Sequence, residues 1–200
     1  MITALELRDV GVRRGGRKLF ANLSLTLKAG EACALTGANG AGKTSLLRAV
    51  AGLAPLEGGA VTFGDADPTE ARNGGLHLVG HQDGLKPARP VREELDFWSV
   101  WSGGTAAAAL AAAEALELTS LLDLEVRRLS AGQRRRLVLS RLLAAPRALW
   151  LLDEPLSPLD ALWRGRFGEM MRAHLTGGGL ILAAVHDPLP IAARVLEIAG

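Results

Sequence analysis

The sequence contains a single cysteine, and this scarcity excludes an internal disulfide framework. Cys33 lies in the apolar stretch EACALT, where we expect it to act as a small buried hydrophobic residue. No stretch approaches the ~18 consecutive apolar residues that a membrane-spanning helix needs. The first ten residues include Glu6, Arg8 and Asp9 and have no apolar run of signal-peptide length. We therefore expect a chain that is soluble by itself, faces the cytosol and relies on a partner for any part within a membrane.

A strong excess of positive charge is also missing. The 23 Lys and Arg residues against 21 Asp and Glu residues give a formal net charge of only +2. The arginines are scattered, and the densest run, Arg134–Arg136, lies inside a motif described below. Charge alone therefore does not suggest nucleic-acid binding. A length of 200 residues, 48% of them hydrophobic, instead predicts one folded domain with a substantial core.

Short apolar runs alternate with helical patterns along the chain, which predicts an α/β fold with a mostly parallel sheet. The expected strands are 23–27 (antiparallel and half-buried), 31–36, 60–63, 76–79, 148–152 and 179–185, and the expected helices are 43–51, 91–101, 105–118 and 160–175. Gly52 is expected at the end of the first helix.

The middle of the chain has a different composition. Alanine, leucine and glutamate dominate residues 91–118 and favour helix. In the alanine-rich helix expected at 105–118, we expect Leu110, Leu116 and Leu118 to form the apolar face. Residues of about 84–145 are interpreted as a helical subdomain inserted into the α/β core.

The segment GANGAGKT (residues 37–44) fits the phosphate-binding pattern G-x-x-x-x-G-K-[ST] between a predicted strand and a predicted helix. Glycines let backbone N–H groups turn toward phosphate oxygens, and a helix N-terminus favours an anion. Lys43 would place a positive charge at the terminal phosphates, and the Thr44 hydroxyl could ligate Mg²⁺. A glycine-rich turn with a chance lysine is the alternative. The expected nucleotide-binding residues are Gly37, Ala38, Asn39, Gly40, Ala41, Gly42, Lys43, Thr44 and Ser45.

A second segment, ALWLLDEP (residues 148–155), is an apolar strand that ends in two carboxylates. Asp153 suits a Mg²⁺ contact, direct or through water. Glu154 is the expected general base, or the residue that orients the attacking water. Adjacent carboxylates could instead cap a following helix, but their occurrence together with a phosphate loop favours the catalytic interpretation.

A third segment, LSAGQRRR (residues 129–136), precedes these carboxylates, and SPLD (157–160) and AAVHD (183–187) follow them. This order resembles that of ABC transporter ATPases over the whole chain, with Ala131 in place of the more usual glycine. The resemblance implies a P-loop NTPase with a RecA-like core, an antiparallel β subdomain and an inserted α-helical subdomain. It also implies ATP as substrate and Mg²⁺ as cofactor.

The resemblance further implies a head-to-tail homodimer, in which each ATP lies between the phosphate loop of one subunit and segment 129–136 of the other. Ser130 and Gly132, with the neighbouring Gln133, would then lie at the γ-phosphate in trans. Asp160 would lie at the dimer centre.

Two further residues have roles implied by the resemblance. His186 would contact the γ-phosphate and organise the attacking water, and Gln82 would reach Mg²⁺ or that water through its amide. A structural histidine and a surface glutamine are the alternatives. The family commonly stacks adenine on an aromatic residue near the position of Arg14, but the sequence has no aromatic residue before Phe20. The Arg14 guanidinium could stack on the base or be a solvated loop residue, which leaves base selectivity open.

The stretch GHQDGLKPARPVREELDFW (residues 80–98) resembles the CcmA family, the ATPase subunits of cytochrome c maturation systems. ATP chemistry does not require this stretch, so we expect it to determine the choice of partner. The resemblance implies an integral membrane partner similar to CcmB, with CcmC, CcmD and CcmE in the same pathway. It places the chain peripherally at the cytoplasmic face of the inner membrane, in a haem-delivery step.

Three alternatives stay open. The first is an ATPase subunit of another small ABC transporter with a different cargo. The second is a nucleic-acid-associated ABC ATPase, which would normally need a tandem cassette, a coiled-coil insertion or a basic extension. The third is a non-catalytic binding module, which would be expected to lack Lys43, Glu154 or His186. Neither His77 nor His81 is a convincing axial ligand for haem, and packing or loop hydrogen bonds are their expected roles.

Overall fold

The structure, a computed structural model, describes residues 2–198. These residues divide into two compact units. Within the described range, the first unit comprises residues 2–80, 147–156 and 164–198, and the second comprises residues 81–146 and 157–163.

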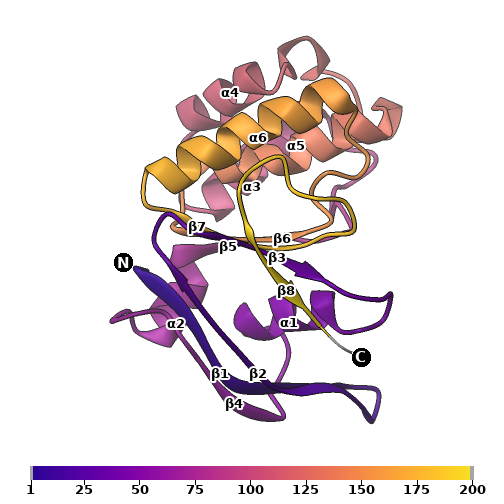
Figure 1. The fold of residues 1–200 in the computed structure, drawn as a ribbon. Helices are drawn as coiled ribbons and strands as arrows, with labels where there is room; N and C mark the ends of the chain where they lie inside the picture. The colour runs from indigo at the N-terminus through magenta and orange to yellow at the C-terminus, as the bar shows by residue number, and fades with distance from the viewer. Residues whose placement is uncertain (1, 199–200) are drawn as a thin grey trace. The chain divides into compact units, whose positions relative to one another are not determined.

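The first unit contains an antiparallel sheet with the strand order β2-β1-β4 (Figure 1). Its strands are β1 (Ala4–Arg14), β2 (Arg17–Lys28) and β4 (Gly58–Thr62). Gly15 and Gly16 join β1 to β2 with φ angles of 55° and 79°, a turn conformation that glycine adopts without strain. The antiparallel strand expected at 23–27 is therefore confirmed as part of a longer β2, whereas β1 was not predicted.

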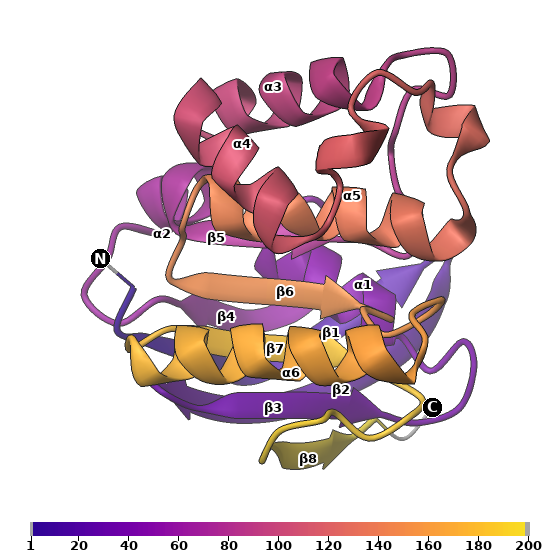
Figure 2. The ribbon, with the colours of Figure 1, turned by 90° about the horizontal axis from the view of Figure 1, so that it is seen from above.

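The first unit also contains a parallel sheet with the strand order β5-β6-β7-β3-β8. Its strands are β3 (Ala32–Thr36), β5 (Leu76–Val79), β6 (Leu149–Asp153), β7 (Leu180–Ala184) and β8 (Arg194–Glu197). Every residue of β6 and β7 is buried, as continuous apolar runs in a parallel sheet require. The prediction of an α/β fold with a parallel sheet is confirmed. Figure 2 shows β3 and β6 running in the same direction, so their carboxyl ends lie at one edge of the sheet.

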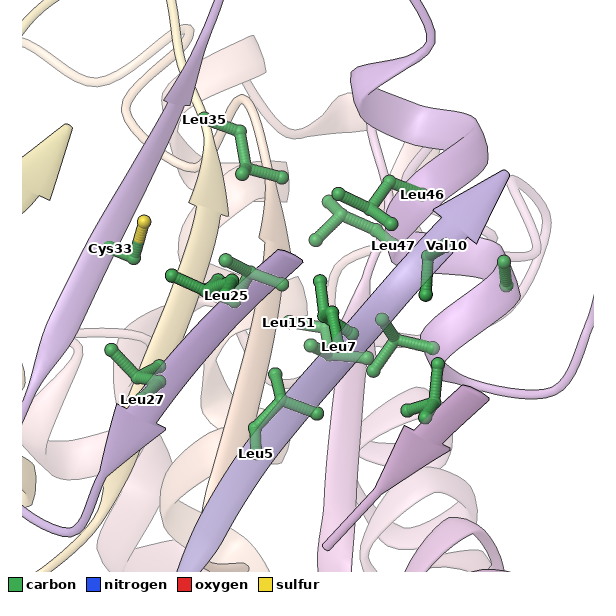
Figure 3. Packing of buried hydrophobic residues seen from close by; sticks show 14 of the residues in the cluster. Leu5, Leu7, Val10, Leu25, Leu27, Cys33, Leu35, Leu46, Leu47 and Leu151 are labelled. Carbon is green, nitrogen blue, oxygen red and sulfur yellow. The ribbon is translucent and has the colours of Figure 1, made fainter. Parts of the chain in front are cut away.

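Helix α1 (Lys43–Val50) contacts both sheets of the first unit. Its Leu46 and Leu47 are fully buried and join a core with residues of β1, β3 and β6, as Figure 3 shows. Gly52, with a φ of 76°, follows the end of the helix as expected. Cys33 is fully buried and not in a disulfide, and burial raises the pKa of its thiol to about 11 against a smaller opposing effect of Arg194.

Three further elements belong wholly or partly to the first unit. They are α2 (Pro68–Glu70), a π-helical turn at Ala71–Gly75, and the larger part of α6 (Ala161–Thr176). The Phe167 ring of α6 lies parallel to the Trp150 ring of β6, with 6.4 Å between the ring centroids.

The second unit is helical. It contains α3 (Val91–Trp101), α4 (Ala106–Ala115) and α5 (Ala131–Ala144), with single 3-10 turns at Thr119–Leu121 and Val126–Arg128. Helix α4 contacts both α3 and α5. None of the described helices has the combination of length and apolarity that crossing a bilayer requires.

One prediction about α4 is wrong. Leu110 was expected on its apolar face but is 51% exposed. The buried face instead consists of Ala109, Ala112 and Ala113, which continue to the buried Leu116 with helical spacing. Leu116 and Leu118, which were expected on the same apolar face, are 1% and 0% exposed, so this part of the prediction is confirmed.

Candidate active site

The loop of residues 37–42 joins β3 to α1 at the carboxyl edge of the parallel sheet. Two of its glycines are required by their surroundings. Gly37 has a φ of 131°, and a Cβ there would lie 2.5 Å from the backbone oxygen of Ile198. Gly42 has a φ of 111°, and a Cβ there would lie 2.8 Å from the Phe20 ring. The loop therefore has a backbone path that only glycine allows at these two positions.

The backbone amides at the N-terminus of α1 lie next to this loop. Gly42 is the N-cap, no side chain caps the helix, and the first turn contains no acidic residue. The positive end of the helix dipole is thus not neutralised by a side chain of α1, an arrangement that favours an anion.

Lys43 lies across the loop rather than in solvent. It is only 8% exposed, and its Nζ donates hydrogen bonds to the backbone oxygens of Gly37 at 2.7 Å and Ala38 at 3.3 Å. A buried ammonium group held by neutral carbonyl oxygens is well placed to exchange them for anionic phosphate oxygens, which bind it more strongly.

Thr44 and Asp153 meet although they are far apart in the sequence. The Thr44 hydroxyl lies 3.1 Å from Oδ1 and 3.0 Å from Oδ2 of Asp153, and donates to this carboxylate. Asp153 is the last residue of β6 and is buried. Together they form a cluster of hard oxygen atoms beside the loop, the donor type that Mg²⁺ prefers.

Glu154 and His186 come together for a topological reason. Glu154 follows β6 and His186 follows β7, which are neighbouring parallel strands, so both leave the sheet at the same edge. The Nε2 atom of His186 lies 3.3 Å from Oε1 of Glu154. Glu154 has a φ of 51°, uncommon for a residue with a side chain, and its N–H donates to the Ala184 oxygen at 2.9 Å. Backbone strain of this kind is concentrated at functional sites.

A second cluster lies in the helical unit, at the start of α5. Ser130 is the N-cap: its hydroxyl accepts a hydrogen bond from the Gln133 N–H at 3.2 Å, and the Gln133 side chain accepts one from the Ser130 N–H at 2.7 Å. Asp160 caps α6 in a similar way by accepting a hydrogen bond from the Trp163 N–H at 2.8 Å. Ser130, Gly132, Gln133 and Asp160 all line one hollow of about 250 Å³.

Sequence reasoning did not assign a site role to the other four residues that line this hollow, Arg136, Pro158, Leu159 and Trp163. The Arg136 guanidinium lies 4.3 Å from the centroid of the Trp163 ring. Arg136 also donates to the Leu116 backbone oxygen at 2.6 Å. Its position four residues after Gly132 puts it on the same helix face, and this spacing could have identified it from the sequence.

The remaining predicted residues are placed as follows. Gln82 is exposed and lies at the start of the helical unit. Arg14 is exposed at the end of β1, opposite Arg17 of β2. His77 is buried on β5, whereas His81 is exposed.

Comparison with known proteins identifies the family. The model of the ABC transporter family matches residues 20–157. The chain is 48% identical over 198 residues to the cytochrome c biogenesis ATP-binding export protein CcmA of Nitrobacter winogradskyi, covering 98% of this chain and 99% of that protein. It is 53% identical over 200 residues to the protein of the same name from Rhodopseudomonas palustris strain BisB18, with 98% and 99% coverage.

Solved structures show the same fold at low sequence identity. A putative ABC transporter ATP-binding protein from Pyrococcus furiosus superimposes with a TM-score of 0.84 at 20% identity, covering 98% of both chains. An ATP-binding cassette in a dimeric post-hydrolysis state superimposes with a TM-score of 0.83 at 22% identity, covering 97% of this chain and 94% of that one. With the phosphate loop, the paired Glu154 and His186, and full-length relatives in agreement, the chain belongs to the ABC transporter ATPases, and within them to the CcmA family.

Proposed function

We propose that this chain is the ATP-hydrolysing subunit of a transporter complex that powers a haem-delivery step in c-type cytochrome biogenesis. The observation that supports this most strongly is the 48% to 53% identity, over nearly the whole chain, to proteins named cytochrome c biogenesis ATP-binding export protein CcmA. The geometry of the candidate site supports the same proposal.

ATP binding is assigned to residues 37–45. Backbone amides of the loop and of the first turn of α1 would surround the phosphates. Lys43 would release the carbonyl oxygens of Gly37 and Ala38 and bind the terminal phosphates instead. Because no aromatic residue precedes Phe20, the Arg14 guanidinium is the group that could stack on the base.

Mg²⁺ would fit the oxygen cluster of Thr44 and Asp153. The Gln82 amide is proposed as a further ligand. When bound, the ion would neutralise part of the charge on the transferred phosphate. The hydrogen bonds between the Thr44 hydroxyl and the carboxylate hold both groups in place beforehand.

Hydrolysis is assigned to Glu154, His186 and Gln82. The Glu154 carboxylate would accept the proton of the attacking water. His186, whose Nε2 lies 3.3 Å from that carboxylate, would contact the γ-phosphate and organise the attacking water. Gln82 would help to position the water through its amide. The positive φ of Glu154 supports a functional role for this residue, because such backbone strain is concentrated at functional sites.

The hollow at Ser130, Gly132, Gln133 and Asp160 is proposed to face the ATP of a second copy of the chain. The N-terminus of α5 would then offer its amides to the γ-phosphate. A structural neighbour is described as dimeric and bound to ADP and Pi, which supports a dimer, and we propose that this dimer is a head-to-tail homodimer. The second unit is proposed to be the inserted helical subdomain, predicted over about residues 84–145, of a single ABC ATPase domain.

The partner surface is proposed to include residues 83–86, which follow Gln82. In this segment Lys86 is exposed and Leu85 is half-buried, so Lys86 is the better probe of docking. The partner would be an integral membrane protein similar to CcmB, in a pathway with CcmC, CcmD and CcmE. The chain would then lie peripherally at the cytoplasmic face of the inner membrane, without a role in nucleic-acid binding.

The test is co-purification from membranes of the native host, with a tag on this chain. We expect a CcmB-like membrane protein to be recovered with the wild-type chain and with Lys43→Ala. Lys86→Glu should recover less of it because the reversed charge disturbs the docking contact. Recovery of a membrane subunit of unrelated transporters, with no CcmB-like protein, would contradict the cytochrome assignment and leave the ABC ATPase assignment in place.

A further inference from the structure

A buried charged network surrounds the segment that follows Gln82. We call it the Arg141 network, and it comprises Asp83, Glu94, Trp98, Arg135 and Arg141, all within the helical unit. Its acidic centre is Glu94 of α3, which is 1% exposed. One carboxylate oxygen accepts a hydrogen bond from Trp98 Nε1 at 3.1 Å, and the other accepts one from the Lys86 N–H at 3.3 Å. Segment 83–86 is thus attached to α3 through a carboxylate that cannot move into water without losing these partners.

Arg141 attaches the same segment to α5. Its guanidinium lies 3.6 Å from the centroid of the Trp98 ring, and its Nη2 donates to the backbone oxygen of Asp83 at 3.0 Å. Burial lowers the pKa of Arg141 to about 10, against the opposing effects of Glu94 and Asp83, so it stays protonated at neutral pH. Its Nε is buried and makes no hydrogen bond with the part of the chain that the structure describes. Contacts with Trp98 and Asp83 therefore hold Arg141 in place, although its Nε donor makes none of these contacts.

Arg135 provides a second connection from the same helix. It is 1% exposed, and its Nη1 lies 3.7 Å from Oδ1 of Asp83. Both the backbone and the carboxylate of Asp83 are therefore held by arginines of α5. A buried ion pair by itself is weak support for a functional role, because such pairs also occur as structural features.

The location of the network is what distinguishes it. Asp83 is the residue next to Gln82, and α5 is the helix that begins beside Ser130. In contrast, both side chains of the ion pair between Arg92 and Asp123 in the same unit are exposed.

We propose that Arg141, together with Arg135, is a positioning residue for ATP hydrolysis: it holds Asp83, and through it Gln82, in a fixed relation to the Ser130 end of α5. This inference rests on the proposed roles of Gln82 and Ser130. Phosphate binding by Lys43 and Thr44 does not involve the network. Loss of the network should therefore lower kcat while the KM for ATP stays nearly unchanged.

The test compares Arg141→Met, Arg141→Lys and the matched control Arg92→Met in the full chain purified with its membrane partner. Methionine keeps much of the side-chain volume but lacks the charge and the donors. Misplacement of a catalytic group can reduce turnover by about tenfold to a hundredfold, so we expect a kcat loss in this range for Arg141→Met with an ATP KM within about twofold of wild type. Arg141→Lys should recover part of the loss, because lysine keeps the charge above Trp98. Arg92→Met should behave as wild type.

Three results with the variants would overturn the inference. One is a folded Arg141→Met complex with wild-type kcat. Another is a rise in KM that matches the fall in kcat, which would indicate general loosening. If Arg141→Met does not fold, Asp83→Asn replaces it, since this change weakens the Arg135 contact and keeps the backbone acceptor. An unchanged kcat in Asp83→Asn would be the third result.

A wild-type complex without ATP hydrolysis would overturn the proposed function and this inference with it. An active wild-type complex with an unaffected Arg141→Met variant would overturn this inference alone.

Discussion

The ammonium group of Lys43 is held by two carbonyl oxygens of its own loop and is nearly inaccessible to water. No other lysine or arginine is present in residues 37–45, so Lys43→Ala removes the only positive side chain of the loop. We expect ATP hydrolysis to fall at least about a hundredfold, the loss typical for a preorganised donor to a transition state, and ATP binding to weaken. Steady-state hydrolysis and equilibrium titration with ATP measure the two effects. Wild-type turnover in Lys43→Ala would contradict the assignment of the loop.

His174 offers a prediction about the pH dependence of stability. Its ring stacks on Trp150 with 3.9 Å between centroids, and burial lowers its pKa, with backbone hydrogen bonds to Leu180 and Ala148 opposing the shift. Because His174 is protonated more easily in the unfolded chain, the unfolded state binds more protons than the folded state once the pH falls below about 6.5. The contribution of neutral His174 is therefore complete above that pH and is lost as pH falls toward the lowered pKa.

The measurement is denaturant unfolding at several pH values between 5 and 8. We expect the free energy of unfolding to fall on acidification, and His174→Gln to reduce the steepness of this fall. His81→Gln is the matched control because that side chain is exposed, and it should leave the slope unchanged. Equal slopes for wild type and His174→Gln would show that His174 does not contribute.

At the scale of single elements, the alanine-rich helix α4 gives a test of the corrected packing. Leu116, immediately after the helix, is 1% exposed, whereas Leu110 is 51% exposed. Leu116→Ala should lower the free energy of unfolding by about 2–5 kcal/mol, as for other buried leucines. Leu110→Ala should change it by less than about 0.5 kcal/mol. Denaturant unfolding of both variants checks this, and equal losses would mean that the buried face has been misassigned.

Elements with a strong apolar pattern could be predicted from the sequence. The strands β6 and β7 are uninterrupted apolar runs, and the phosphate loop marks the end of β3 and the start of α1. Strand β8 could not be predicted, because three of the four residues of this edge strand are exposed, including the apolar Val195. Strand β1 was missed where its pairing with β2 shifts register between Leu7 and Val10, which breaks the alternating pattern.

Candidate site residues could be named from the sequence, but their arrangement in space could not. The sequence identified Glu154 and His186 separately, but their proximity depends on β6 and β7 being neighbours, which only the sheet order establishes. The Arg134–Arg136 run shows the same limit. Its three side chains have different partners within the chain: the Leu129 oxygen, Asp83 and the Leu116 oxygen. Each arginine of this run thus has a different partner within the chain.

At the scale of the whole molecule, the proposed dimer predicts complementation between inactive chains. Gly132→Asp places a carboxylate where the γ-phosphate of the other subunit is expected, and a Cβ at Gly132 would meet only the Pro158 oxygen at 3.7 Å, an ordinary contact. Gly132→Asp and Lys43→Ala should each be inactive alone. In a mixed head-to-tail dimer, however, one site combines the intact Lys43 of one chain with the intact Gly132 of the other.

We therefore expect ATP hydrolysis to reappear when the two variants are co-expressed with different tags and the mixed complex is isolated. If both halves of the site came from one chain, the mixed complex would stay inactive. This measurement separates a shared site from a site within a single subunit.

The most direct test of the central proposal, that ATP hydrolysis by this chain powers c-type cytochrome biogenesis, uses Glu154→Gln. Glutamine keeps the shape of the side chain but cannot accept the proton of the attacking water. The measurement is covalently bound haem in the c-type cytochromes of a host strain whose own copy of this chain is deleted. The wild-type chain should restore it, and Glu154→Gln, present at equal abundance on the membrane, should not. Full restoration of haem-containing c-type cytochromes by Glu154→Gln, or none by the wild type, would contradict the account.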